Sequence, residues 1–215
     1  MKKLFAAAAF VFLFAQNLFA APETAQISAK EASDWATKKG SEILNIISEP
    51  LSSDKYQRLD NIMLNDVDLP YIARFVVGKY WKKMTSEQQE QYLEMFNSYI
   101  LGVYKTFPLE FDSSAIKYKV EKVEPKKKSA DIFMSVKIEG VTTSSDNPDS
   151  AIEVVFKVHK SDKKLKLIDM KIANSSLLQT YRTKFYDLIL KDEEEMEWFL
   201  EDFELWIPNT DKAEE

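Results

Sequence analysis

The spacing of apolar residues changes twice along this 215-residue chain, and no other feature constrains the fold as much. From about residue 28 to 107, apolar side chains recur every three to four residues, as in amphipathic helices. Between about 116 and 172 they alternate with polar residues in four runs, as in half-buried strands. Helical spacing then returns from Leu178 to Ile207. This order predicts an α+β fold with N-terminal helices, a four-stranded antiparallel curved sheet and C-terminal helices.

Capping residues and prolines set the predicted helix boundaries. Ser28 with Glu31, and Thr85 with Gln88, have the spacing of a capping box. Asp68 is placed to cap a helix that ends at a glycine. We therefore expect helices over about 28–48, 53–65, 68–78 and 85–107, followed by about 178–189 and 196–207.

The four runs of alternating residues are joined by polar connections, which favours an antiparallel meander with one solvated face. In the last run the alternation slips between Leu167 and Ile168. Such a slip predicts a β-bulge, or a residue buried on both faces, at that point.

The N-terminus has the pattern of a secretory signal peptide. Lys2 and Lys3 precede an uncharged apolar run, which ends before small residues suited to cleavage after Ala20 or Ala21. No later segment is long and apolar enough to span a bilayer. We expect residues 1–20 to direct export to the periplasm, and residues 21–215 to form a single domain. The chain has no cysteine, so we expect its core, not disulfides, to hold that domain together.

Charge and residue types exclude several classes of function. The formal net charge is −6, which argues against a nucleic-acid partner. One histidine, His159, and no cysteine leave no set of ligands for a zinc site and no Cys-His pair. There is no Gly-x-Ser-x-Gly elbow and no glycine-rich phosphate loop. We therefore expect that the protein is not an enzyme and binds no metal and no cofactor. His159 is expected on the solvated face of its strand. A Ser-His-Asp arrangement stays open.

Two charged clusters each allow two interpretations. Lys126, Lys127 and Lys128 follow a proline between the first two strands. We expect them to solvate a turn, while an anionic head group or a membrane surface is the alternative. The acidic run 192–195 opens the last helical segment, where negative charge suits the helix dipole. A calcium site or a docking patch is the alternative there.

Amphipathic helices beside a half-apolar sheet can enclose either a solid core or a cavity. Periodicity alone cannot separate the two, and on that evidence a solid core is favoured.

Two stretches of the sequence resemble a known family. The first is residues 69–85, reading LPYIARFVVGKYWKKMT, followed by Gln88, Phe96 and Tyr104. The second is residues 167–170, reading LIDM, followed by Leu177, Leu178, Tyr181, Arg182 and Phe185. In this order, together with a signal peptide, they resemble the MlaC family of periplasmic phospholipid carriers, also called toluene-tolerance auxiliary proteins.

The resemblance implies a non-enzymatic, monomeric carrier with a deep cavity between sheet and helices. The cavity would take the acyl chains of a phospholipid and leave the head group near the surface. It also implies two protein partners, the substrate-binding component of an inner-membrane ABC transporter and an outer-membrane lipoprotein complex, and a role in outer-membrane lipid asymmetry. On the matching segments and the apolar phase we expect these residues to bind lipid: Ile72, Phe75, Val76, Tyr80, Phe96, Ile100 and Tyr104 from the helices, and Met134, Val136, Val154, Phe156 and Met170 from the sheet.

The chain departs from the family pattern at several positions. Leu165 stands where a tryptophan is common, Val77 where a leucine is common and Met84 where an alanine is common. At 173–175 Ala-Asn-Ser replaces a glycine-containing turn. Asparagine tolerates a left-handed backbone, so the turn is still possible. Two other functions stay open: a periplasmic chaperone or lipoprotein carrier that shelters acyl chains or peptide, and a lipid hydrolase that uses a serine and His159.

Overall fold

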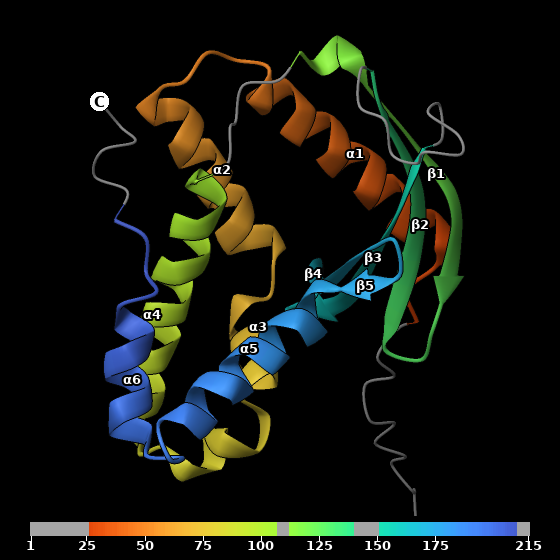
Figure 1. Ribbon diagram of the computed structural model, residues 1–215. Helices are drawn as coiled ribbons and strands as arrows, with labels where there is room; N and C mark the ends of the chain where they lie inside the picture. Colours follow the sequence, from red (N-terminus) through yellow and green to blue (C-terminus); the bar gives the residue numbers. More distant parts are fainter. Residues whose placement is uncertain (1–25, 107–111, 140–150, 210–215) are drawn as a thin grey trace, which may run out of the picture.

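The computed structural model describes residues 26–106, 112–139 and 151–209. The predicted signal peptide and the connection between the second and third strands lie outside these residues, as does residue 107, where the fourth helix was predicted to end. Within them, helices precede and follow an antiparallel sheet, which confirms the predicted fold class (Figure 1).

The N-terminal helices begin and end close to the predicted positions. Helix α3 is followed by a 3₁₀ helix, η1, which the sequence did not predict. The elements are α1 (Ala29–Ile47), α2 (Ser53–Asp66), α3 (Leu69–Val77), η1 (Gly78–Lys83) and α4 (Ser86–Lys105).

Local hydrogen bonds explain where these helices start. Thr85 and Gln88 form both halves of the predicted capping box on α4. Ser28 caps α1 by accepting from the Glu31 amide at 3.1 Å, but the Glu31 carboxylate pairs with Lys160 of the sheet at 3.0 Å. At α1, therefore, the serine half of the predicted capping box forms. The Glu31 side chain instead links the start of the helix to a strand of the sheet.

The sheet follows the predicted meander, with strands in the order β1-β2-β3-β4-β5, all antiparallel. A two-residue strand, β5, adds to the four that were predicted. The register passes from Lys157 opposite Asp169 to Val158 opposite Leu167, so Ile168 is the extra residue of a bulge. The predicted slip is confirmed. The strands are β1 (Ile116–Pro125), β2 (Ser129–Ile138), β3 (Ile152–Ser161), β4 (Lys164–Ile172) and β5 (Ser175–Ser176).

The C-terminal helices are α5 (Leu177–Lys191) and α6 (Met196–Glu204). The acidic run lies between them and forms the turn, since Glu193 and Glu194 have positive φ angles of 55° and 62°. Glu195 is the N-cap of α6, yet its side chain makes no capping hydrogen bond. Glu194 instead accepts from the Tyr80 hydroxyl at 2.9 Å. The described residues contain no group of three or more His, Cys, Asp or Glu side chains that could hold a metal ion, so the calcium alternative has no support there.

The buried apolar residues form two main cores on opposite sides of the molecule. One lies among α3, α4, α5 and α6, where the buried rings of Tyr92, Phe96 and Phe185 pack together. The other lies between α1 and the inner face of the sheet, where Ala32 and Ala36 meet Ile132 and its neighbours. In Figure 1 the helical part and the sheet with α1 diverge, and α2, α3 and α5 bridge them. The fold therefore has two packed regions, and Leu167 of β4 contacts both.

The turn between β4 and β5 holds Ala173 and Asn174 at positive φ angles of 47° and 68°. An alanine is strained in this region, because its Cβ approaches the following carbonyl oxygen, whereas glycine is not. We expect Ala173→Gly to raise the free energy of unfolding by about 1 kcal/mol. Urea denaturation measures this change. Asn174→Gly is the matched control and should gain less, since asparagine tolerates the left-handed region; an unchanged stability for Ala173→Gly would contradict the expectation.

Candidate functional site

Two hollows lie between the sheet and the helices. The first, here called the helical hollow, has a volume of about 330 Å³ and is walled by α3, α4, α5 and β4. The second, the sheet hollow, has a volume of about 260 Å³ and is walled by α1, α2 and the inner face of β1, β2 and β3. Met63, Val67 and Leu167 line both hollows, so the two adjoin. Together they fall within the size range of small-molecule sites in proteins.

The walls of both hollows are almost entirely apolar. Among the described residues that line them, only Lys39, Asp66 and Asp169 carry a charge. Asp169 is occupied by the protein itself, since its two oxygens accept from the Ser176 hydroxyl at 2.8 Å and from the Leu178 amide at 3.1 Å. Lys39 and Asp66 pair with each other at 2.6 Å. An apolar ligand would therefore meet hydrocarbon over most of its surface.

Helix α1 shows how the sequence produces a hollow and not a solid core. Its small residues Ala32 and Ala36 are buried against the sheet, while the larger Trp35, Ile43 and Leu44 line the sheet hollow and remain partly exposed. The large side chains that would otherwise fill a core thus face open space. Ile43, which keeps 37% of its surface exposed, lies where the hollow meets solvent.

Seven of the residues predicted to bind lipid line these hollows. Those of the helical hollow come from α3, α4 and β4, and those of the sheet hollow from β2 and β3. They are Ile72, Ile100, Tyr104 and Met170 in the helical hollow, and Met134, Val136 and Phe156 in the sheet hollow.

The structure does not bring the other five to the hollows. Val76, Tyr80 and Phe96 are at most 1% exposed and belong to the helical core, because helix packing turns them toward α5 and α6. Phe75 lines a separate surface groove. Val154 is buried on β3 between Met134 and Ile172 and lines neither hollow.

Sequence reasoning missed most of the wall. It predicted the helices that became α1 and α2 but assigned none of their residues to the site. For two of the missed residues the sequence did carry a signal, the break in alternation on β4. The bulge at this break lets both Leu167 and Ile168 reach the helical hollow. The missed apolar residues are Trp35, Ala36, Ile43, Leu44, Ile62, Met63, Val67, Leu69, Val103, Ile116, Tyr118, Leu167, Ile168, Leu177, Leu178 and Tyr181.

Comparison with known proteins identifies the family. Residues 38–201 match the family described as MlaC protein. The chain belongs to the MlaC family. Its fold also matches a phospholipid-binding protein from Ralstonia solanacearum, solved in complex with a phospholipid, with a TM-score of 0.64 and 17% sequence identity over 81% of this chain and 96% of that one. No curated protein matched the chain.

The residues that carry the MlaC resemblance hold the walls in place. Arg182 of α5 donates to the Phe75 carbonyl at the end of α3 and stacks on the Phe75 ring, with its guanidinium 5.0 Å from the ring centre. Gly78 ends α3 with a φ of 52°, and a Cβ there would lie 2.4 Å from the Tyr186 hydroxyl. Asp169 joins β4 to the start of α5. Of these three MlaC residues, Arg182 and Gly78 shape the cavity from outside, and Asp169 lines it.

His159 lies in a polar setting away from the hollows. Its Nε2 atom is 2.7 Å from Asp68 Oδ2, and its side chain is only 19% exposed, so it is less exposed than the predicted surface histidine. The cause is α3, whose start covers this end of β3. Burial opposes ionisation of Asp68, but hydrogen bonds from the Tyr71 amide and from His159 outweigh it and lower the pKa of the carboxyl. Asp68 thus acts as a helix cap that also fixes the histidine.

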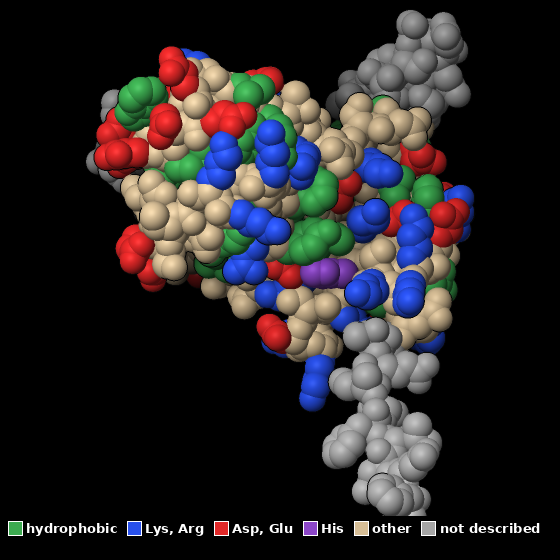
Figure 2. Space-filling view, turned by 90° about the horizontal axis from the view of Figure 1, so that it is seen from below, with side chains coloured by type: hydrophobic (Ala, Val, Ile, Leu, Met, Phe, Trp, Pro, Cys, Tyr) green, Lys and Arg blue, Asp and Glu red, His purple; other side chains and the backbone are tan. Residues whose placement is uncertain are grey.

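A surface groove runs beside this pair, with Tyr71, Arg74, Phe75 and Lys166 among its lining residues. Figure 2 shows this face of the molecule, where lysine and arginine side chains gather around the histidine and neighbouring apolar residues. The groove shares no lining residue with either hollow.

The predicted lysine cluster lies at the hairpin between β1 and β2. Lys126, Lys127 and Lys128 are all exposed, and Lys126 pairs with Asp131. None of the three lines a hollow, which agrees with the interpretation that they solvate a turn.

In the part of the chain that the structure describes, no helix is both long and apolar enough to cross a membrane.

Proposed function

We propose that this MlaC protein is a periplasmic phospholipid carrier that moves lipid between outer- and inner-membrane complexes and so maintains outer-membrane lipid asymmetry. In this proposal residues 1–20 are removed on export and residues 21–215 form one lipid-binding domain. The observation that carries it is the pair of adjoining apolar hollows between sheet and helices. Membership in a family of non-enzymatic lipid-binding proteins, and a fold shared with a phospholipid-binding protein, support it.

The hollows suit the energetics of such a task. Each buried methylene contributes about 0.8 kcal/mol, so a chain of roughly 16 carbons represents about 13 kcal/mol that must stay shielded from water. A shallow groove would leave much of the acyl-chain surface exposed to water. Hollows set between the sheet and helices α1 to α5 can shield it.

The histidine does not favour the hydrolase alternative. In a Ser-His-Asp triad, one ring nitrogen of the histidine takes the proton of the serine while the other bonds the carboxylate. Here Asp68 binds His159 Nε2 and also accepts a hydrogen bond from Ser161, so the Ser161 hydroxyl is bonded to the carboxylate. Asp68 is engaged as a helix cap as well.

Mass spectrometry tests the carrier proposal. The mature protein, purified without detergent and extracted with organic solvent, should release diacyl phospholipid at about one molecule per chain, because the hollows shield tails that water rejects. A sample heated to unfold the protein and then washed serves as the control and should release none. Protein that purifies empty, or with bound polypeptide, would overturn the proposal and favour the chaperone alternative.

A further inference from the structure

The helical and sheet hollows leave a phospholipid head group few charged partners. Of the three charged residues that line them in the described part of the chain, Asp169 is already bonded through both oxygens. Tyr104 is also engaged, since its hydroxyl contacts Asp60 and the Tyr56 carbonyl. Lys39 and Asp66 remain, and both belong to the sheet hollow.

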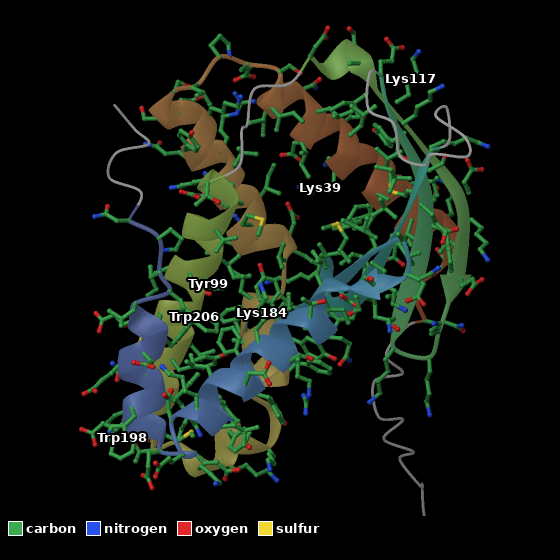
Figure 3. The ribbon with its side chains drawn as sticks, in the orientation of Figure 1. Lys39, Tyr99, Lys117, Lys184, Trp198 and Trp206 are labelled. Carbon is green, nitrogen blue, oxygen red and sulfur yellow. The ribbon has the colours of Figure 1, made fainter. Side chains whose placement is uncertain are left out.

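Lys39 and Asp66 lie where a head group can reach them while the tails stay inside. Their side chains are 21% and 20% exposed, so each reaches solvent from a largely buried position. Figure 3 shows Lys39 on the inner side of α1, toward α2. Lys39 Nζ also contacts Glu42 at 2.8 Å, and Glu42 is 41% exposed. The three residues, here called the rim triad, thus extend from the wall of the sheet hollow to the surface.

The rim triad has a definite charge pattern. Burial would lower the pKa of Lys39, but hydrogen bonds to Asp66 and Glu42 outweigh it and raise that pKa, so Lys39 stays charged at neutral pH. One ammonium between two carboxylates leaves a formal charge of −1. Asp66 is also the last residue of α2, where the helix dipole is negative and a cation is favoured.

A zwitterionic head group complements this pattern. The Lys39 ammonium has three donors, of which two are used, so one remains for a phosphate oxygen. Glu42 and Asp66 can accept from a second ammonium placed beside that phosphate. A head group with phosphate alone, or with neutral hydroxyls, brings a net negative charge to a site that is already negative.

We infer that the Lys39–Asp66–Glu42 triad is the head-group site of this carrier, and that it selects phospholipids whose head group carries a primary ammonium over anionic ones. The inference rests on the proposed carrier function and adds the substrate class. Lys39 holds the phosphate, and the two carboxylates hold the ammonium. This arrangement keeps the tails in the apolar hollows, because the triad lies at the edge of the sheet hollow.

Competition loading tests the inference. The delipidated mature protein is incubated with vesicles of equal parts phosphatidylethanolamine and phosphatidylglycerol, and the bound lipids are extracted and quantified. The wild-type protein should take up mainly phosphatidylethanolamine. Glu42→Gln and Asp66→Asn should each raise the bound share of phosphatidylglycerol about three- to tenfold relative to phosphatidylethanolamine, since each removes one negative charge next to the phosphate.

Two controls separate a change in head-group selectivity from a change in folding and from an effect of any altered charge elsewhere on the protein. Glu42 is the most exposed member of the triad, so Glu42→Gln should leave the melting temperature unchanged even if Asp66→Asn lowers it. Lys184→Gln changes a lysine that lies near Tyr99 and Trp206 on the helical part, away from Lys39 (Figure 3), and should not alter the lipid ratio.

The outcomes separate this inference from the carrier function. Unchanged lipid ratios in Glu42→Gln and Asp66→Asn, with normal total lipid, would overturn the head-group site while the carrier function stands. A change in Lys184→Gln alone would place the head group at the helical end and overturn it as well. Failure of the wild-type protein to take up any lipid would overturn the carrier function itself.

Discussion

Replacing Met63 with tryptophan should empty the protein of lipid without unfolding it. Met63 lies on α2 and lines both hollows, so a larger side chain there blocks the place where they adjoin. If the indole displaces about three methylenes of the ligand, the loss is about 2–3 kcal/mol, or roughly 30- to 150-fold in affinity. Phospholipid per folded chain, measured by mass spectrometry of protein purified without detergent, should fall accordingly.

The neighbouring residue provides the matched control. Leu64 lies on the same helix, is 45% exposed and lines neither hollow. Leu64→Trp should therefore retain lipid at the wild-type level. The melting temperature of delipidated Met63→Trp should stay close to that of the delipidated wild type, because the new ring enters existing space and does not overpack a filled core. Full lipid content in Met63→Trp would show that the tails do not lie across this point.

The sequence predicts the elements of this fold well because their signals are local. The capping box of Thr85 and Gln88 and the cap at Asp68 each depend on residues three apart in the chain. The bulge at Ile168 was visible because one residue breaks a period of two. Each of these features is fixed by its own segment and does not depend on the rest of the molecule.

The site was harder to predict because a hollow depends on what is missing between distant elements. Phe96 and Ile100 lie one turn apart on α4 and share its apolar stripe, yet Phe96 packs against Phe185 while Ile100 lines the helical hollow. Their periodicity is the same, so only the position of α5 and β4 separates core from wall. The same holds on α1, where Ala32 is buried in the core beside the sheet while Ile43 lines the sheet hollow.

His159 illustrates a second kind of failure. Its strand phase predicts exposure, and Glu153 and Lys157 on that phase are polar. The start of α3 covers it through Asp68 and through Tyr71, whose ring centre lies 5.1 Å from that of the histidine. A contact between residues 91 positions apart leaves no periodic trace in either segment.

Phe96 and Ile100 of α4 also provide a test of which residues belong to the core and which to the lipid site. Phe96 is fully buried, with ring centres 5.9 Å from Tyr92 and 5.8 Å from Phe185. Phe96→Ala opens a new cavity in a filled core and should lower the free energy of unfolding by about 3–5 kcal/mol. Ile100→Ala enlarges a hollow that already exists, so it should cost about 1–2 kcal/mol, which is the transfer term with little added for a cavity.

Lipid retention should show the opposite order. Ile100 would contact the acyl chains directly, so Ile100→Ala should reduce the phospholipid bound per folded chain several-fold, while Phe96→Ala, at a temperature where it stays folded, should hold lipid nearly as the wild type does. Urea denaturation of delipidated protein gives the stabilities, because bound lipid would add its own stabilisation to either variant. Equal stability losses in the two variants, or lipid loss confined to Phe96→Ala, would mean that the helical hollow is filled by side chains and that the tails lie elsewhere.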